Sequence, residues 1–164
     1  MPTIDEYAHR PREERLTRIA RTPSELAAAV RGAADAVLSY RPAPKSWAAT
    51  EVICHLRDNE EWFLERMKLV VAMDQPWFVA TNPDRWAEER QYLRNDATVA
   101  LAAFTRRREE TLEFLQRLGP DDWARSGVHA DSRGRRTIDE FLSVMAWHDD
   151  NHLDQLRRAL DGRA

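Results

Sequence analysis

Apolar side chains recur at steps of three and four residues over two long stretches in the middle of the chain. This spacing places them on one face of an α-helix. The first stretch begins at Ser46 or Ala48 and continues to about Met73, and the second covers residues 96–118 before the stop signal Gly119-Pro120. The stripe of the first stretch contains Val52, His55, Leu56, Asn59, Trp62, Phe63, Arg66, Met67 and Val70. The pattern predicts two long helices.

A further helical pattern, near the C-terminal end, carries polar residues at positions that should face the core. Apolar positions 138, 141 and 145 continue at the same steps to His148, His152 and Leu156. The segment Thr137-Ile138-Asp139-Glu140 has the pattern of a capping box, so this helix is predicted to begin there and to end near Leu160. Its two imidazoles point toward the interior of the fold.

The N-terminal region predicts one more helix behind a charged arm. Residues 1–21 are rich in charge and contain two prolines, so we expect an arm that packs loosely or against a second subunit. Thr22-Pro23-Ser24-Glu25 has the pattern of a capping box, with Thr22 as the N-cap and Pro23 at the first helical position. This helix is predicted to run to about Tyr40, before the proline-containing linker 41–44.

Two connecting segments carry mixed signals. Residues 74–95 combine a loop with a short helix over about 83–90 that could cover one end of a bundle, and residues 121–136 indicate turns or a small hairpin. Only 5 residues are glycine, which disfavours a sheet-rich fold full of tight turns. The sequence therefore predicts an all-α four-helix bundle, with an arm at residues 1–21 and one domain at residues 22–162.

Composition narrows the classes of function. With 164 residues and a formal net charge of −3, the chain suits one domain and has no overall attraction for nucleic acid. The basic run Arg106-Arg107-Arg108 is short and stands beside two glutamates, so nucleic acid is not expected as a partner. The single cysteine, Cys54, cannot form an intramolecular disulfide, and no segment approaches the length of about 20 apolar residues that spans a bilayer. We expect a cytoplasmic protein without membrane contact.

The histidines of the two core stripes are candidate metal ligands. His148 and His152 lie about 6 Å apart along one helix face, so their rings can converge on one cation, and His55 is the best third donor. Three imidazoles leave a coordination position open, as in catalytic sites. The alternative is that each is an ordinary buried histidine with a hydrogen-bond partner. For the pair, two unsatisfied imidazoles would each cost about 1–3 kcal/mol, which favours the metal.

Three carboxylates stand near these histidines in the sequence. Glu51 precedes His55 by one turn, Asp58 follows it by three residues, and Asp149 adjoins His148. A ligating imidazole usually donates its second N–H to such an acceptor, and a carboxylate could also act as base for a bound water or thiol. The alternative is that these are solvated charges on helix faces.

Two segments resemble the DinB-like superfamily, with its damage-inducible and YfiT-like branches. Residues 47–60, WAATEVICHLRDNE, followed by Arg66, are similar to the second-helix signature of that family, and residues 147–155, WHDDNHLDQ, are similar to its last helix. With WAEER at 86–90 and Trp123, the resemblance covers about residues 15–160. Many relatives have a further histidine where this chain has Asn151, which leaves the three expected ligands in place.

The resemblance implies an up-down-down-up four-helix bundle, often homodimeric, that holds a divalent metal through the residues matching His55, His148 and His152. Family members include transferases and isomerases that use low-molecular-weight thiols such as bacillithiol, mycothiol or glutathione, and many members without known activity. The partners that the resemblance implies are thus a small thiol or electrophile and a second copy of the chain.

We therefore expect a metal-dependent enzyme, with a thiol S-transferase or a related isomerase or hydrolase acting on a small electrophile as candidates. Zinc, nickel, iron and manganese all suit three imidazoles, and such an ion lowers the pKa of a bound thiol or water. Arg133, Arg135 and Arg136 are candidates to bind a carboxylate of the thiol cofactor or substrate, or else form a solvated basic loop. The alternative function is a non-catalytic metal-binding bundle with a role in stability, regulation or stress response.

Overall fold

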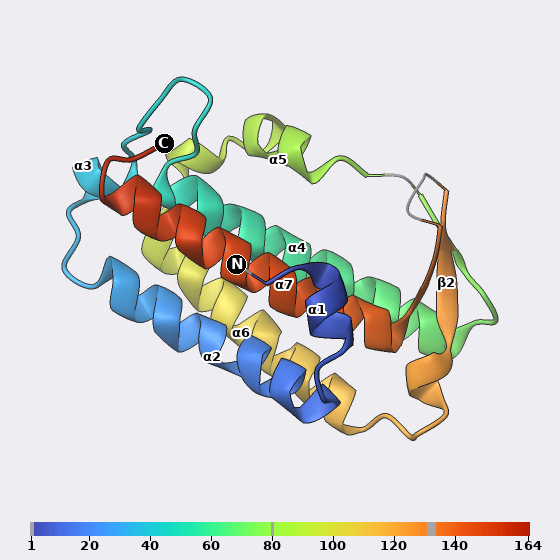
Figure 1. Ribbon diagram of the computed structural model, residues 1–164. Helices are drawn as coiled ribbons and strands as arrows, with labels where there is room; N and C mark the ends of the chain where they lie inside the picture. Colours follow the sequence, from blue (N-terminus) through green and yellow to red (C-terminus); the bar gives the residue numbers. More distant parts are fainter. Residues whose placement is uncertain (1, 80, 131–133) are drawn as a thin grey trace.

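Four long helices lie side by side in the computed structural model of the protein (Figure 1). They are α2 (Arg12–Val30), α4 (Ala49–Ala72), α6 (Ala97–Gln116) and α7 (Ile138–Leu160). α4 and α2 each pack against both α6 and α7, which closes the bundle. The structure describes residues 2–79, 81–130 and 134–164.

Shorter elements connect and cover the bundle. The helical ones are α1 (Ile4–Ala8), α3 (Asp35–Leu38), α5 (Pro83–Glu89) and the 3-10 turns η1 (Tyr92–Arg94) and η2 (Asp122–Ala124). The extended ones are β1 (Trp77–Phe78), β2 (Ser126–His129) and β3 (Arg135–Thr137). Within the described residues, none of the helices has a run long and apolar enough to span a bilayer.

The order of chain directions is up-down-down-up. Figure 1 shows α2 and α7 running one way along the bundle and α4 and α6 running the other way. Because α4 and α6 are consecutive and parallel, the chain must travel back along the bundle between them, and α5 lies on that return path. The predicted fold class is confirmed, with a small sheet added at one end.

The starts of three long helices are confirmed. At α4, Glu51 accepts the Ala48 backbone N–H at 2.9 Å, and at α6, Asp96 accepts the Val99 N–H at 2.9 Å. The box at α7 is complete, since Thr137 and Glu140 each accept the other's backbone N–H. These side chains satisfy amide groups that have no partner inside the helix.

The predicted start of the first long helix at Thr22 is wrong. α2 begins ten residues earlier, at Arg12, and Pro23 lies inside it. A proline in a helix leaves the carbonyl four residues before it without an amide donor, here the carbonyl of Ile19. The buried guanidinium of Arg108 donates to that carbonyl at 2.6 Å, and Thr22 donates its hydroxyl to Asp149 instead of capping a helix. A partner from another helix therefore makes the internal proline acceptable.

The end of this helix also differs from the prediction. α2 stops at Val30, and Gly32 adopts a positive φ of 74°, a conformation that glycine reaches without strain. The predicted boundary between arm and domain at residue 21 falls inside α2. Ahead of α2, the short helix α1 packs on α7, where the buried Tyr7 donates its hydroxyl to Asp150.

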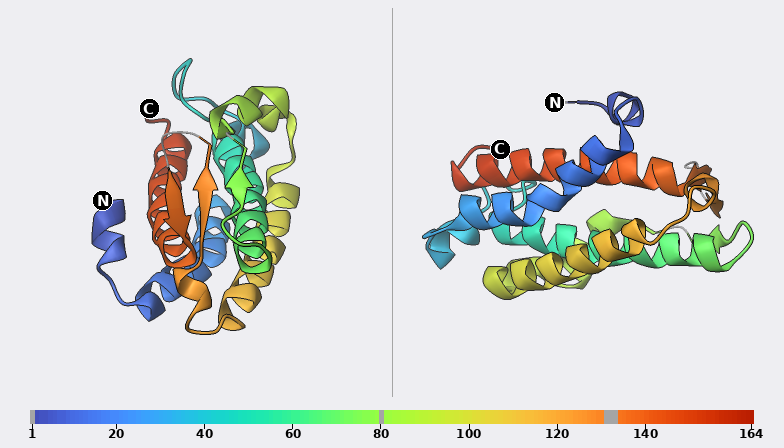
Figure 2. Two further views of the ribbon diagram at one scale, coloured as in Figure 1. Left: turned by 90° about the vertical axis from the view of Figure 1, so that its right-hand side faces the viewer. Right: turned by 90° about the horizontal axis from the view of Figure 1, so that it is seen from below.

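A three-stranded sheet covers the end of the bundle where α4 finishes and α7 begins (Figure 2). β2 and β3 pair antiparallel, as expected for a small hairpin in 121–136, and β1 pairs parallel with β2. Within this sheet Phe78 lies opposite His129, and Gly127 lies opposite Arg136. A Cβ added at Gly127 would lie 2.3 Å from the Cζ atom of Phe78, so only glycine fits beneath that ring.

Candidate metal centre

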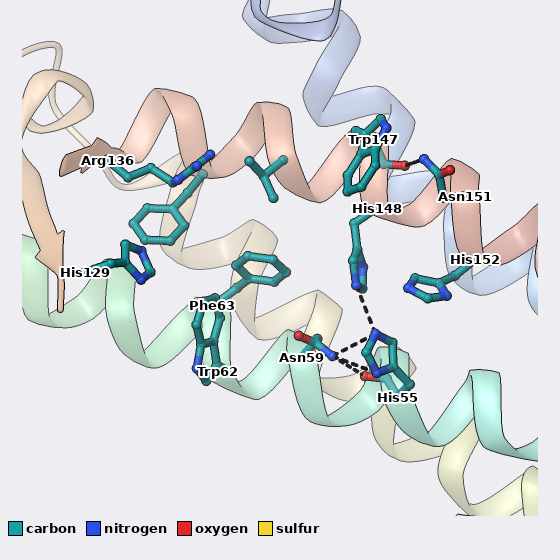
Figure 3. Close-up of a pocket in the computed structure, with 12 residues that line it drawn as sticks. His55, Asn59, Trp62, Phe63, His129, Arg136, Trp147, His148, Asn151 and His152 are labelled. Atoms are coloured by element: carbon teal, nitrogen blue, oxygen red, sulfur yellow. Dashed lines mark hydrogen bonds between the residues drawn. The ribbon is translucent and has the colours of Figure 1, made fainter. Parts of the chain in front are cut away.

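Three histidines from two helices meet at one point inside the bundle. His55 comes from α4, and His148 and His152 come from α7 (Figure 3). One ligand nitrogen of each ring lies within 4.8 Å of the other two, and the Nε2 atoms of His55 and His148 are 3.2 Å apart. The convergence expected from the sequence is therefore present in the described part of the structure.

This arrangement fits a divalent cation. Two imidazole nitrogens separated by 3.2 Å share either one proton or one cation. Zinc–nitrogen bonds of about 2.0–2.1 Å in tetrahedral geometry place two ligand nitrogens about 3.3 Å apart. Burial lowers the pKa of His55 to about 3 and holds the pKa of His148 well below its usual value, with a further contribution from the neighbouring His152. The rings of His55 and His148 are therefore neutral at physiological pH, as ligands must be.

Neighbouring polar groups orient the rings. The Nδ1 atom of His152 lies 2.8 Å from the Oε1 atom of Gln155, which accepts its proton and makes Nε2 the unprotonated nitrogen of the ring. Asn59 donates to the backbone carbonyl of His55 at 2.9 Å, and its amide nitrogen lies 3.2 Å from the Nδ1 atom of that ring. Trp47 packs against the cluster, with its ring centroid 4.7 Å from that of His55.

A cavity of about 380 Å³ extends from the histidine cluster toward the sheet. This volume lies in the usual range for small-molecule sites. Its walls are mostly aromatic or aliphatic, and its polar groups stand at the two ends (Figure 3). The apolar and aromatic lining residues are Trp62, Phe63, Phe141, Val144 and Trp147. The histidine cluster thus faces a partly open, largely apolar space.

The structure does not bring Glu51 or Asp58 to the histidine rings. Both carboxylate oxygens of Glu51 accept from Arg41, and one also caps α4. Asp58 accepts from Arg57, Arg90 and Tyr92. Burial alone would raise the pKa of Asp58, but these hydrogen bonds outweigh it and lower that pKa. Each carboxylate therefore forms an ion pair that joins α4 to a neighbouring segment of the chain.

Asp149 binds Arg108 and Thr22 rather than a histidine of the cluster. It lies beside His148 in the sequence, but its carboxylate accepts from Arg108 and from the hydroxyl of Thr22 on the opposite side of α7. Arg108 is 1% exposed and also binds Glu60 through two hydrogen bonds of 2.8 and 2.7 Å. Burial alone would lower the pKa of Arg108, but the two carboxylates raise it. This buried group connects all four long helices.

Of the candidate arginines among the described residues, only one is found at the cavity. Arg133 lies outside the described residues. Arg135 donates to Ser126 and Gln75, away from the cavity, whereas Arg136 lines the cavity at the end nearest the sheet. Consecutive side chains of a strand point to opposite faces, which explains the different positions of these neighbours.

Sequence reasoning missed two residues of the site. Gln155 follows His152 by three residues on the same helix, a spacing that could have identified it as a partner. His129 lines the cavity from β2 and is only 3% exposed, but it stands in a polar connecting segment without helical periodicity. Only the pairing of the strands places it there.

Comparisons with known proteins agree with this geometry. The family model of the DinB superfamily matches residues 18–156. The proposed metal-dependent hydrolase YfiT of Bacillus subtilis is 23% identical over 131 residues, which are 80% of this chain and 74% of that protein. The proposed metal-dependent hydrolase OB0413 of Oceanobacillus iheyensis is also 23% identical over 131 residues, covering 79% of this chain and 74% of its own length.

Two solved structures share the fold. The structure of YfiT from Bacillus subtilis, described as having an unusual four-helix bundle topology, superposes with a TM-score of 0.84 at 20% identity, covering 90% of this chain and 85% of that one. A mycothiol-dependent maleylpyruvate isomerase superposes with a TM-score of 0.72 at 16% identity, covering 95% of this chain and 63% of that one. With the family match over most of its length, the chain belongs to the DinB superfamily.

Proposed function

We propose that this protein is a metal-dependent enzyme that holds one divalent ion between His55, His148 and His152 and acts on a small molecule in the adjoining cavity. The observation that carries the proposal is the convergence of three imidazoles, with ligand nitrogens within 4.8 Å of one another, at the end of that cavity. Three nitrogen ligands suit zinc, nickel, iron or manganese.

The position of the cluster favours a catalytic ion over a structural one. A structural site is usually closed by four protein ligands, whereas three ligands leave one position for a substrate or water. His55, His148 and His152 all line the cavity, so an ion that they would hold is accessible to a small molecule bound there. The bundle also has its own buried connection between helices, centred on Arg108, which does not require a metal.

The lining of the cavity favours a nucleophile that does not depend on a carboxylate base. Among the described residues that line it, none is an aspartate or a glutamate. A bound divalent ion supplies acidity by lowering the pKa of a water or thiol in its open position. Hydrolysis by water, or transfer or isomerisation with a low-molecular-weight thiol, are therefore the reaction classes that we propose. The name of YfiT supports hydrolysis, and the name of the mycothiol-dependent isomerase supports a reaction with a thiol.

Metal analysis of untagged protein tests the proposal. We expect about one transition-metal ion per chain by mass spectrometry, and loss of that ion in His148→Ala. His129→Asn is the matched control, because His129 lines the same cavity outside the three-histidine cluster and should leave the metal content unchanged. The proposed centre is refuted if the wild-type protein binds no metal after addition of zinc, nickel, iron(II) or manganese. It is also refuted if the His148→Ala variant keeps its full metal content.

Turnover separates the enzyme from a non-catalytic metal-binding bundle. Metal-loaded protein is incubated with a panel of small esters, amides and electrophiles, with and without glutathione, mycothiol or bacillithiol. The proposal expects turnover that a chelator abolishes and that restored metal recovers. If chelation only lowers the melting temperature and no substrate of the panel is consumed, the non-catalytic function is favoured.

A further inference from the structure

The inner face of the small sheet carries two polar side chains into the far end of the cavity. In a sheet, residues directly opposite each other on neighbouring strands project to the same face. Phe78 pairs with His129, and Gly127, two residues before His129, pairs with Arg136. His129 and Arg136 therefore share one face, and both line the cavity.

Aromatic rings hold His129 in place. Its ring centroid lies 5.1 Å from that of Phe78, 5.8 Å from that of Trp62 and 5.9 Å from that of Phe141. Figure 3 shows His129 and Arg136 at the same end of the cavity, away from His55, His148 and His152. A buried imidazole and a guanidinium at the end of an apolar space together form a recognition site for an anion.

The two ends of the cavity are separated by the length of a small molecule. Phe141, whose ring centroid lies 5.9 Å from that of His129, and His148, in the metal cluster, lie on α7 seven residues apart, which corresponds to about 10 Å along the helix axis. Phe63 and Val144 line the space between them. A ligand that spans the cavity must therefore combine an apolar body with polar groups at both ends.

We propose that Arg136 and His129 bind the carboxylate of the substrate, so that the substrates are small organic acids with a flat, apolar body. The carboxylate lies against the sheet, and the body lies between Phe63, Phe141 and Val144. The opposite end of the molecule then meets the three histidines, a placement that depends on the proposed metal centre. Carboxylate recognition itself does not depend on the metal.

The side chains at this end of the cavity suit a carboxylate. A guanidinium binds the planar carboxylate through two parallel hydrogen bonds, and the imidazole can donate a third. Because the surrounding walls are mostly apolar, an anion that enters without such partners loses hydration without compensation. The cavity should therefore discriminate strongly between an acid and an uncharged molecule of the same shape.

A pair of matched ligands tests the proposal with metal-free protein. Binding of 4-phenylbutyrate and of the uncharged 4-phenylbutan-1-ol is measured by isothermal titration calorimetry in the presence of a chelator. We expect the acid to bind at least tenfold more tightly than the alcohol. Arg136→Gln should remove most of that difference without weakening the alcohol, and His129→Phe should reduce it severalfold.

Arg135→Gln is the control variant, because Arg135 neighbours Arg136 but binds Ser126 and Gln75 outside the cavity. It should bind the acid as wild type does. Unchanged affinity for the alcohol shows that a variant retains a folded cavity, and Arg136→Lys provides a second variant that keeps the charge but not the planar fork. Equal binding of acid and alcohol by the wild type, or an acid preference that survives Arg136→Gln, would overturn the proposal.

Comparison with metal-loaded protein shows whether the carboxylate binds to the ion instead. If the preference for the acid exists only after metal is added and is insensitive to Arg136→Gln, the sheet end of the cavity does not bind the carboxylate. Failure of the metal analysis, by contrast, would remove the proposed reaction but leave the binding difference between acid and alcohol intact. The two proposals therefore fail independently.

Discussion

Arg108 on α6 donates to the backbone carbonyl of Ile19 on α2, the carbonyl that Pro23 leaves without a helical partner. The same guanidinium binds Glu60 of α4 and Asp149 of α7. One buried side chain thus satisfies a break in one helix and neutralises two carboxylates from two others. This relationship explains how α2 continues past Pro23. It also explains why Arg108, Glu60 and Asp149 are tolerated in the interior.

Replacing Arg108 by methionine should strongly destabilise the protein. The change removes the cationic partner of two buried carboxylates and the donor to one backbone carbonyl, and removing one partner of a buried ion pair typically costs about 3–5 kcal/mol. Urea unfolding followed by circular dichroism measures this loss. The control is Arg107→Met, because Arg107 forms partly exposed pairs with Glu61 and Glu110, which should contribute less than about 1 kcal/mol. Similar losses for both variants would contradict this account.

Replacing Gln155 by leucine should weaken the metal site without unfolding the bundle. Gln155 accepts the proton of His152 Nδ1, and loss of such a partner typically lowers metal affinity by about 10–100-fold. Competition with a chromophoric chelator measures the affinity, and thermal unfolding of the metal-free protein checks the fold. Asp154→Asn, at the adjacent half-exposed position that pairs with Arg158, should retain wild-type affinity. Equal affinities for the two variants would argue against this orienting role.

The stability of the metal-free protein should fall as the pH drops below 6.5. Burial first, and the neighbouring histidine charges second, lower the pKa of His55 to about 3 and that of His148 well below 6.5. The unfolded chain therefore binds protons that the folded chain does not, so stability is complete above pH 6.5 and is lost as pH falls toward the folded values. Each histidine contributes a slope of about 1.4 kcal/mol per pH unit.

Urea unfolding between pH 6.5 and 5 with a chelator present measures this slope. Asp58 and Asp139 have pKa values lowered below 3.8, so they titrate outside this window. The variant His148→Gln should show a slope about 1.4 kcal/mol per pH unit smaller than the wild type. An unchanged slope in this variant would mean that His148 is not the neutral buried group that its environment implies.

Replacing Gly127 by alanine should disturb the sheet that covers the cavity. The new methyl group would meet the ring of Phe78 at 2.3 Å, and Phe78 is only 3% exposed, so the ring must move. Inserting a methyl into a well-packed site typically costs about 1–3 kcal/mol. Thermal unfolding measures the loss, and Gly119→Ala is a control because the nearest atom to its added Cβ would be an Asp122 oxygen at 3.5 Å. If both variants unfold at the same temperature, the packing under Phe78 is not close.

The amino-acid sequence by itself determined the elements whose signals are local. The three- and four-residue spacing of apolar positions, together with the stop signal Gly119-Pro120 and the capping box at Thr137, predicted α4, α6 and α7, because these signals act within a single helix. The same spacing placed His148 and His152 on one core-facing stripe. The pattern also gave His55, on the core stripe of another predicted helix, as the best third donor, and the resemblance to a known family implied the same three ligands.

Only the tertiary structure decided the features that depend on partners distant in the sequence. Pro23 lies inside α2 because Arg108, 85 positions later, supplies the missing donor. Asp149 lies next to His148 in the sequence, but it binds Arg108 and Thr22, since side chains one residue apart on a helix point in different directions. The position of His129 likewise follows from strand register, which pairs it with Phe78 and brings it to the face that Arg136 shares.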